Sequence, residues 1–173
     1  MVFIICGLSE VERLAKDRLP SHMITLIDPA TPVSTPPSLA PNRHLRLNVN
    51  DITAPAEGLV APSHAVVEKI LGFGADWDEA APMLIHCWAG ISRSTATAFM
   101  LACERSAEAD EREIALAMRR AAPHAFPNRR IVALADEVLG RRGRMVAALE
   151  VMGEFDHTLA RPFDFAARHH NPT

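Results

Sequence analysis

Short apolar runs in the first half of the chain predict the strands of a small sheet. Residues 2–6 (VFIIC) and 23–27 (MITLI) are apolar segments rich in isoleucine, and residues 44–49 (HLRLNV) alternate polar with apolar positions. These patterns are typical of β-strands. A further run, MLIHC at 83–87, has no polar alternation, which indicates a central parallel strand that is covered on both faces.

Apolar positions spaced three and four residues apart predict helices between and after these runs. Residues 9–19 (SEVERLAKDRL) open with Ser9 and Glu12 in the pattern of a capping box, and another helix is expected to start at Ser63. The same spacing returns later in the chain, over residues 96–103, 114–121, 131–138 and 145–152. This order indicates an α/β fold, with a small parallel-rich central sheet of about four or five strands flanked by helices and a helical C-terminal half.

Two irregular segments and the C-terminal end complete the predicted organisation. Residues 29–41 are rich in proline, which favours a surface loop whose role the sequence does not define. Residues 50–63 (NDITAPAEGLVAPS) form a second irregular stretch, and in a compact domain such a loop is more often a functional lid than filler. We expect a single domain over residues 1–153, followed by a C-terminal tail at 154–173 that packs on it or is partly irregular.

Composition and charge narrow the class of protein and its partners. The chain has 173 residues and a formal net charge of −3, so it offers no general attraction to nucleic acid or to an anionic membrane. No apolar stretch approaches the roughly 20 residues that a membrane helix needs. The first eight residues, MVFIICGL, lack a basic leader and are interpreted as a buried strand rather than a secretory segment. Three widely spaced cysteines without a CxxC pair predict a reduced, cytoplasmic protein.

The stretch HCWAGISRS at 86–94 holds the strongest candidate chemistry. Cys87 stands at the carboxyl end of a predicted strand, where sites form in open α/β sheets. The loop after it runs into a predicted helix, so its backbone N–H groups and the helix start can cradle a dianion. Gly90 permits backbone angles that a side chain would forbid, and Arg93 can grip two oxygens of one phosphoryl group.

Cys87 is expected to be a nucleophile, because the field that attracts phosphate also stabilises a thiolate at neutral pH. Ser94 could donate its hydroxyl to that sulfur and steady it as the leaving group when a thiophosphate intermediate is hydrolysed. The spacing between Cys87 and Arg93 lets both side chains close around one phosphorus atom. This chemistry needs no metal and no other cofactor.

HCWAGISRS resembles the signature of the cysteine-based protein tyrosine phosphatase superfamily: His-Cys, five residues, Arg, then Ser or Thr. Gly90 matches the glycine of that pattern, and Arg93 and Ser94 match its end. Over residues 40–140 the order of elements is similar to that of the small dual-specificity phosphatases. The resemblance implies that His86 holds the loop by hydrogen bonding and is not a metal ligand. It also implies a substrate cradle made by Trp88, Ala89, Gly90, Ile91, Ser92 and Arg93.

The resemblance further implies a general acid, which in the family is an aspartate on a mobile loop upstream of the cysteine. Asp51 fits this position because it lies in the irregular segment at 50–63, and Glu57 is the fallback if the loop registers differently. Three other acidic residues are poorer candidates, because they precede the strand at 83–87 and so lie at its opposite end: Asp76, Asp78 and Glu79.

The function expected from these residues is that of a phosphomonoester hydrolase, of the protein-tyrosine or dual-specificity type, that forms a phosphocysteine intermediate. Its partner would be a phosphorylated protein or a small phosphate ester. The variable loop positions are uncharged, which argues against polyphosphoinositides and favours phosphotyrosine or another monophosphate ester. Two alternatives stay open: a catalytically weak phosphate-binding regulatory module, and a phosphatase of an RNA 5′-phosphate, nucleotide or sugar phosphate. A rhodanese-type sulfur transferase is disfavoured, because its shorter loop would not place an arginine six positions after the cysteine.

The remaining cysteines favour structural roles. Cys103 lies on the apolar face of a predicted helix and is interpreted as a core residue. Cys6 ends the first predicted strand, where a structural role is also preferred. The alternative is that Cys6 lies at the same edge of the sheet as Cys87 and acts as its partner after oxidation.

Three features outside the catalytic chemistry have two interpretations each. Trp88 either lines the rim of the pocket, where it could stack on an aryl phosphate, or packs against a neighbouring helix. Asn128 resembles a Pro-Asn helix start of the small dual-specificity members, and an ordinary helix cap explains it as well. The basic cluster at 141–144 (RRGR) is interpreted as a solvated turn between helices, with a docking patch for an acidic partner as the alternative.

Overall fold

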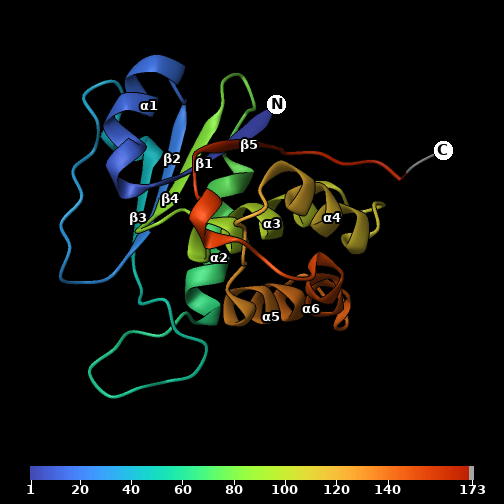
Figure 1. Ribbon diagram of the computed structural model, residues 1–173. Helices are drawn as coiled ribbons and strands as arrows, with labels where there is room; N and C mark the ends of the chain where they lie inside the picture. The colour runs from blue at the N-terminus through green and yellow to red at the C-terminus, as the bar shows by residue number, and fades with distance from the viewer. Residues whose placement is uncertain (172–173) are drawn as a thin grey trace.

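The computed structural model describes residues 1–171, which form a five-stranded sheet with the strand order β3-β2-β4-β1-β5 (Figure 1). The first four strands run parallel to one another: β1 (Val2–Gly7), β2 (His22–Ile27), β3 (His44–Asn48) and β4 (Met83–Cys87). The fifth, β5 (Phe163–Ala166), is antiparallel and pairs with β1 at the edge of the sheet. The strand that leads into HCWAGISRS is therefore central, with a parallel neighbour on each side.

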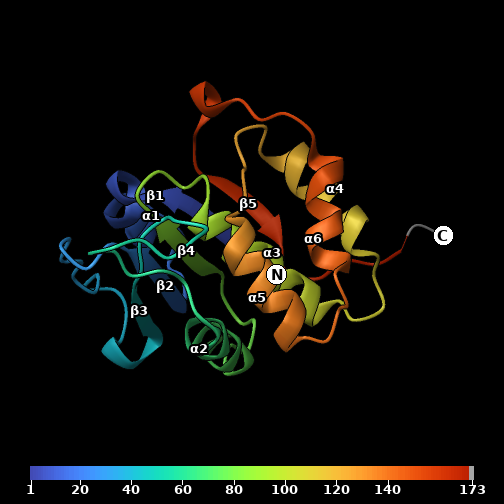
Figure 2. The same ribbon diagram turned by 90° about the horizontal axis from the view of Figure 1, so that it is seen from below.

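Helices cover both faces of the sheet (Figures 1 and 2). One face is covered by α1 (Val11–Arg18). The other face packs on α2 (His64–Ala75), α3 (Arg93–Arg105), α4 (Glu111–Ala121), α5 (Arg129–Val138) and α6 (Arg144–Ala148). Short 3₁₀ turns lie at Leu8–Glu10, Pro41–Arg43, Leu149–Met152 and His157–Leu159. Two apolar cores result, a large one under the helical half of the chain and a smaller one between the sheet and α1.

Helix α3 occupies the middle of the larger core. Its residues from Arg93 to Cys103 are all buried, because the helix lies between the sheet and the other helices of that face. Cys103 is among them and is fully buried, as the apolar spacing predicts. The start of α3 is therefore fixed from all sides, which gives the loop before it a rigid base.

The predicted α/β fold is confirmed, and two local details differ from expectation. Glu10, not Ser9, occupies the N-cap position of α1, because a 3₁₀ turn at Leu8–Glu10 comes between β1 and the helix, so the predicted capping box is wrong. Strand β5 lies in the segment at 154–173, where a C-terminal tail is expected. Its four residues, FDFA, are too few to show a strand pattern, and their pairing with β1 depends on a distant part of the chain. Residues 172–173 of that tail lie outside the described residues.

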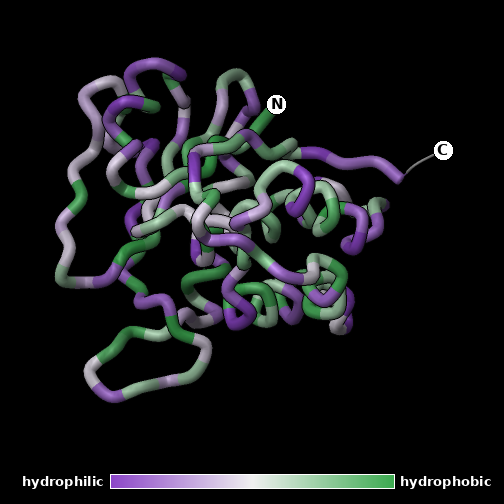
Figure 3. Tube along the Cα trace, in the orientation of Figure 1, coloured by the Kyte–Doolittle hydropathy of each residue, from purple (hydrophilic) through white to green (hydrophobic). Residues whose placement is uncertain are grey.

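The proline-rich loop closes over the α1 side of the sheet. Leu39 is buried in the smaller core, and the Ser38 hydroxyl donates a hydrogen bond to the carbonyl oxygen of Ala15 in α1. The second irregular segment, between β3 and α2, extends away from the body of the molecule (Figure 1) and carries both hydrophobic and hydrophilic positions (Figure 3). Within residues 1–171, every helix is too short or too polar to cross a membrane.

Candidate active site

The loop at 88–92 joins the end of β4 to the start of α3 and is pressed against the end of β1. Gly90 has a φ of +75°, and a Cβ placed there would come within 2.6 Å of the carbonyl carbon of Cys6. Glycine is therefore required at this position both for its backbone angle and for its size. Gly7 is nearly as tight, because its Cβ would lie 3.0 Å from the Trp88 carbonyl oxygen. Nothing in the sequence pattern indicates this second close approach.

Three carbonyl groups of the loop are turned toward neighbouring segments, and each accepts a hydrogen bond from a backbone N–H there. Leu8 donates to the Trp88 oxygen at 3.0 Å, Phe126 to the Ile91 oxygen at 2.9 Å, and Asn128 to the Ser92 oxygen at 3.2 Å. A carbonyl and the N–H that follows it in the same trans peptide point in opposite directions. The N–H groups of residues 89, 92 and 93 therefore point toward the inside of the loop, where they can cradle an anion.

Cys87 and Arg93 stand at the two ends of this cradle, and both are buried. The Sγ of Cys87 lies 3.2 Å from the Oγ of Ser94, within hydrogen-bond distance for sulfur. Arg93 donates from one terminal nitrogen to the carbonyl oxygen of Val49 at 2.8 Å, while its buried Nε has no hydrogen-bond partner among residues 1–171. A buried donor of this kind carries a desolvation penalty, so this guanidinium is poised to receive an acceptor.

Asp51 is brought to the same loop by the segment after β3. One carboxylate oxygen, Oδ1, accepts hydrogen bonds from the Ser92 hydroxyl and from the Asn128 amide, both at 2.7 Å. The other oxygen, Oδ2, lies 4.0 Å from the Nε of Arg93. The side chain is 37% exposed. The carboxylate is thus anchored through one oxygen, and the second oxygen is left open beside the arginine.

Asn128 serves two elements at once. Its side-chain oxygen accepts from the backbone N–H groups of Arg130 and Ile131, which caps the start of α5, while its side-chain amide holds Asp51. Both sequence interpretations of Asn128, as a helix cap and as a family feature, leave this contact with Asp51 unidentified. The contact joins residues 77 positions apart, so local patterns carry no signal for it.

The other acidic candidates have different surroundings. Glu57 is exposed on the segment that follows Asp51. The poorer candidates lie before β4, where Asp78 accepts from the backbone N–H of Ala80 and Glu79 forms ion pairs with Arg105 and Arg168. The geometry therefore brings Asp51 to the catalytic loop and leaves Asp78 and Glu79 at the amino end of the strand.

Behind the loop, buried polar side chains form a chain of hydrogen bonds on the α1 side of the sheet. The Nε2 of His86 lies 2.6 Å from the Thr25 hydroxyl, which lies 2.8 Å from the Nε2 of His44. The Nδ1 of His44 lies 2.8 Å from the Thr35 hydroxyl, which accepts from Arg46 at 2.7 Å. The proline-rich loop thus supplies Thr35 to this chain.

One assignment of protons satisfies every member of this chain. The Nδ1 of His86 faces the carbonyl oxygen of Cys87 at 3.4 Å and must donate to it, so the Nε2 of a neutral His86 accepts from Thr25. Thr25 then accepts from His44, which accepts from Thr35. The donors run in one direction, from Arg46 at the surface to the backbone of Cys87. His86 therefore braces the loop, as the resemblance implies.

Burial keeps both histidines neutral. Burial and the neighbouring Arg93 charge lower the pKa of His86 to about 4, against the opposing effect of its hydrogen bond to Cys87. Burial, with the charge of Arg46, lowers the pKa of His44 to about 4. Among residues 1–171, no group of three or more His, Cys, Asp or Glu side chains is placed to hold a metal ion.

Cys6 lies on the opposite face of the sheet from Cys87. The register pairs Cys6 with His86 and Gly7 with Cys87, and successive side chains of a strand point to opposite faces. Cys6 belongs to the smaller core on the α1 side, and burial raises the pKa of its thiol to about 12. This geometry favours the structural interpretation of Cys6 over a disulfide with Cys87.

Trp88 and the RRGR cluster at 141–144 are the two remaining features with alternative interpretations. Trp88 is 55% exposed, so its side chain lies at the surface of the loop instead of packing against a helix. The interpretation of the RRGR cluster as a solvated turn is wrong for Arg141. This residue is buried and forms an ion pair with Glu111 at 3.1 Å, which the sequence could not indicate because the partner lies 30 positions earlier, in α4.

Comparisons with known proteins identify the fold. No protein-family model and no curated protein matches this sequence. Among solved structures, DUSP15 matches with 16% identity over 87% of each chain and a TM-score of 0.60. Human DUSP28 matches with 18% identity over 82% of this chain and 99% of its own, with a TM-score of 0.59. Tk-PTP in its active form matches with 21% identity over 80% of this chain and 90% of its own, with a TM-score of 0.58. The chain therefore has the fold of the cysteine-based tyrosine and dual-specificity phosphatases.

Proposed function

We propose that this protein is a phosphomonoester hydrolase of the protein-tyrosine or dual-specificity type, acting through a phosphocysteine intermediate on Cys87. The observation that carries the proposal is the convergence of a cysteine, a buried arginine with an unused donor and an anchored carboxylate on one anion-binding loop. As part of the same proposal, residues 1–153 form the phosphatase domain and the tail that follows packs on it or is partly irregular; the pairing of β5 with β1 supports packing for that part of the tail.

In the first step, the phosphate group of the substrate occupies the loop and the Cys87 thiolate attacks phosphorus. The inward N–H groups and the guanidinium of Arg93 stabilise the charge on the three phosphoryl oxygens. The S–P bond forms as the P–O ester bond breaks, and Asp51 gives its proton to the departing oxygen. The unpartnered Nε of Arg93 gains its acceptor when the phosphate arrives.

In the second step, water hydrolyses the phosphocysteine. Asp51, now a carboxylate, takes a proton from the attacking water, the new P–O bond forms and the S–P bond breaks. The sulfur leaves as a thiolate and accepts a hydrogen bond from the Ser94 hydroxyl, which lies 3.2 Å away. Phosphate is released, and the enzyme returns to its starting state with the thiolate ready for the next substrate.

Ser92 and Asn128 act in both steps as positioning residues for Asp51. Because both donors bind the same oxygen, the carboxyl group can keep its orientation whether the other oxygen carries the proton or not. The open oxygen is the one near Arg93, and so near the bound phosphate. This arrangement lets one carboxyl group serve first as acid and then as base.

The proposal is tested by hydrolysis of p-nitrophenyl phosphate in the presence of a metal chelator, across a range of pH. We expect Cys87→Ser to abolish turnover. Asp51→Asn should lower kcat by roughly 10²-fold and remove the fall in rate at high pH, where a general acid loses its proton. Asp78→Asn, at the opposite end of β4, is the matched control and should keep the wild-type profile.

Two outcomes would contradict the proposal. Turnover that survives Cys87→Ser would exclude a phosphocysteine intermediate. Absence of turnover by the wild type, together with vanadate or phosphate binding that depends on Arg93, would show a phosphate-binding module instead of an enzyme.

A further inference from the structure

Exposed apolar side chains gather on the segments that touch the catalytic loop. We call five of them the apolar rim: Leu59, Val60, Trp88, Phe126 and Phe155, each between 39% and 55% exposed. Trp88 belongs to the loop itself, and Leu59 and Val60 follow Asp51 on the extended segment. The rings of Phe126 and Phe155 stack with their centroids 4.3 Å apart. Half-exposed aromatic residues of this kind are typical of the centres of protein interfaces.

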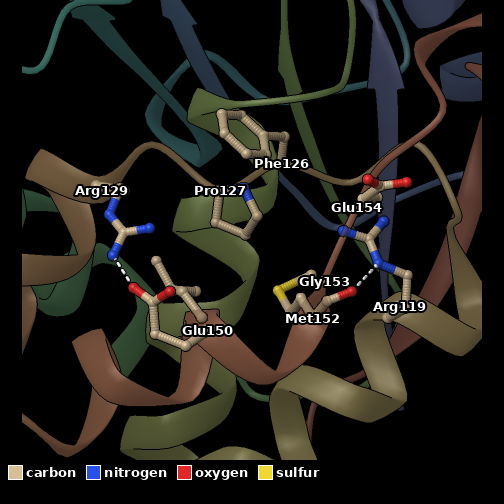
Figure 4. A pocket seen from close by; sticks show the side chains of 9 residues that line it. Arg119, Phe126, Pro127, Arg129, Glu150, Met152, Gly153 and Glu154 are labelled. Atoms are coloured by element: carbon tan, nitrogen blue, oxygen red, sulfur yellow. Dashed lines mark hydrogen bonds and ion pairs between the residues drawn. The ribbon is translucent and has the colours of Figure 1, made fainter.

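A pocket opens beside the same rim (Figure 4). Its volume is about 280 Å³, and its apolar lining comes from Phe126, Pro127, Leu149 and Met152. The backbone that carries Phe126 also donates its N–H to the Ile91 carbonyl of the catalytic loop. The strip of chain that lines the pocket is therefore the same one that holds the outer side of the loop.

The charged side chains of the pocket are already engaged. Arg129 forms an ion pair with Glu150 on one side (Figure 4). On the other side Arg119 donates to the carbonyl oxygen of Met152 at 2.9 Å, and Glu154 lies beside it. Two arginines and two glutamates leave no net charge in the pocket. The pocket therefore lacks the attraction that would draw a second anion, and its apolar walls suit an uncharged side chain.

We propose that this pocket and the apolar rim bind a large apolar side chain that lies within a few residues of the phosphorylated residue in a protein substrate. The inference rests on the proposed function and narrows it, from phosphate esters in general to phosphoproteins. The volume of the pocket fits one large side chain with room to spare, and burying a leucine there should favour binding by about tenfold or more. An anionic membrane fits less well, since such surfaces recruit unpaired basic residues and the arginines here are engaged.

The test uses phosphotyrosyl peptides on an alanine background, in which a single leucine is moved over about four positions on each side of the phosphotyrosine, a reach of roughly 13 Å. The readout is the ratio of kcat/KM for each leucine peptide to kcat/KM for the all-alanine peptide, so a general loss of activity cancels. We expect a ratio of ~10 at one or two positions. Phe126→Ala and Phe155→Ala should each lower it to below about 3. Val138→Ala, which removes a similarly exposed apolar side chain on α5, is the matched control and should leave the ratio unchanged.

The outcomes separate this inference from the proposed function. Turnover of p-nitrophenyl phosphate and of all peptides, with ratios near one, would refute the proposed role of the pocket and support the proposed phosphatase activity. If the wild type turns over neither p-nitrophenyl phosphate nor any peptide, the proposed function fails, and binding of the same peptides is measured by fluorescence polarisation. A preference for a leucine peptide that Phe126→Ala removes would then support the proposed pocket. Equal binding of all peptides would overturn it. Hydrolysis of a long-chain phosphate monoester in vesicles that falls in Phe126→Ala, with peptide ratios near one, would assign the rim to lipid and refute the peptide substrate.

Discussion

A buried arginine lies at each end of helix α3, Arg93 within the helix and Arg141 from the turn before α6, and the two differ in how many of their donors are hydrogen-bonded. At the C-terminal end, Arg141 donates to the carbonyl oxygens of Cys103 at 2.7 Å and Ala107 at 3.2 Å. It also pairs with Glu111, which Arg144 contacts from the other side. A cation at this end complements the helix dipole. Every feature of this cluster stabilises the fold.

At the N-terminal end, Arg93 stands against the dipole, because the start of a helix favours negative charge. Its guanidinium has a single acceptor, the Val49 carbonyl, and its Nε is unpartnered within the described part of the chain. The nearest carboxylate oxygen, that of Asp51, lies 4.0 Å away. An arginine placed this way is unfavourable for folding, and a bound phosphate would supply both the missing acceptor and the missing negative charge.

The carboxylates beside the two arginines, Glu111 and Asp51, also differ in how completely they are hydrogen-bonded. Burial alone would raise the pKa of Glu111, but the hydrogen bond from Arg144 and the charges of both arginines hold it below its ordinary value, so this group stays ionised. Asp51 is more exposed and is hydrogen-bonded through one oxygen only, and its second oxygen lies 4.0 Å from Arg93. Incomplete hydrogen bonding therefore marks the end of the helix that carries the proposed site, and complete hydrogen bonding marks the other end.

Replacing each arginine by methionine should separate activity from stability, with the largest effect at Arg93. We expect Arg93→Met to lower kcat/KM for p-nitrophenyl phosphate by ~10³-fold, because the main side-chain donor to the phosphoryl oxygens is lost. The free energy of unfolding should stay within about 1 kcal/mol of wild type or rise, since Asp51 remains hydrated and a buried unpaired donor is removed. Steady-state kinetics and urea unfolding measure both. A clear loss of stability would show that Arg93 belongs to the fold and contradict the comparison.

Arg141→Met should show the reverse pattern. It leaves Glu111 buried with a single arginine and frees carbonyl groups at the end of α3, so we expect a loss of ~3 kcal/mol in the free energy of unfolding. At 25 °C the folded fraction should keep kcat/KM within about threefold of wild type. Arg142→Met, at the exposed neighbouring position, is the control and should change neither quantity. A drop in kcat/KM larger than the folded fraction explains would mean that the two ends of α3 are coupled.

The sequence predicts what depends on neighbouring residues. Strand β4, the loop after it and helix α3 follow from an apolar run, a motif and a change of period within about twenty residues. The burial of Arg141 cannot be predicted in this way, because its basic neighbours resemble a solvated turn and its partner lies 30 positions earlier in α4. Strand β5 is too short to show a pattern, and its partner is the first strand of the chain.

The residues of the candidate site also fall into two groups, those that a local motif predicts and those that only the fold brings together. The nucleophile, the arginine and the serine come from one motif, and Asp51 came from the position that the resemblance implies. The residues that orient Asp51 were missed, since Ser92 is 41 positions from it and Asn128 is 77 positions from it. The hydrogen-bond chain behind His86 was missed for the same reason. It draws on three strands and the proline-rich loop, which only the folded sheet brings together.

The hydrogen-bond chain of His86 and His44 should contribute to stability, as the cluster of Arg141 and Glu111 does. Its contribution should depend on pH. His86 and His44 have pKa values of about 4 in the folded state, below the ordinary value of 6.5. Between these values the unfolded chain binds more protons, so stability is full above pH 6.5 and is lost as the pH falls toward 4. We expect a loss of about 4 kcal/mol in the free energy of unfolding between pH 7 and pH 5 from these two residues together.

Urea unfolding of wild type and His44→Gln at both pH values measures this. Buried histidines elsewhere, such as His22 and His124, also have lowered pKa values from burial and act in the same direction, so the difference between the two proteins is the informative quantity. The variant should lose roughly half of the effect assigned to the pair. His170→Gln, at an exposed position, should match wild type. An identical pH dependence in His44→Gln and wild type would show that the folded state does not lower the pKa of His44, and would contradict this prediction.

The smallest effect is expected from Ser92, which touches the functional carboxylate without joining the reaction. Ser92→Ala removes one of the two donors to Asp51, so the carboxyl group samples more orientations and protonates the leaving group less often. We expect kcat for phenyl phosphate to fall ~10-fold while KM stays near wild type. With p-nitrophenyl phosphate the fall should be smaller, because p-nitrophenolate departs readily without a proton. Ser92→Thr keeps the hydroxyl and should restore most of the rate. If Ser92→Ala slowed both substrates equally, Ser92 would be acting on the loop as a whole, and the orientation of Asp51 would depend on the Asn128 amide alone.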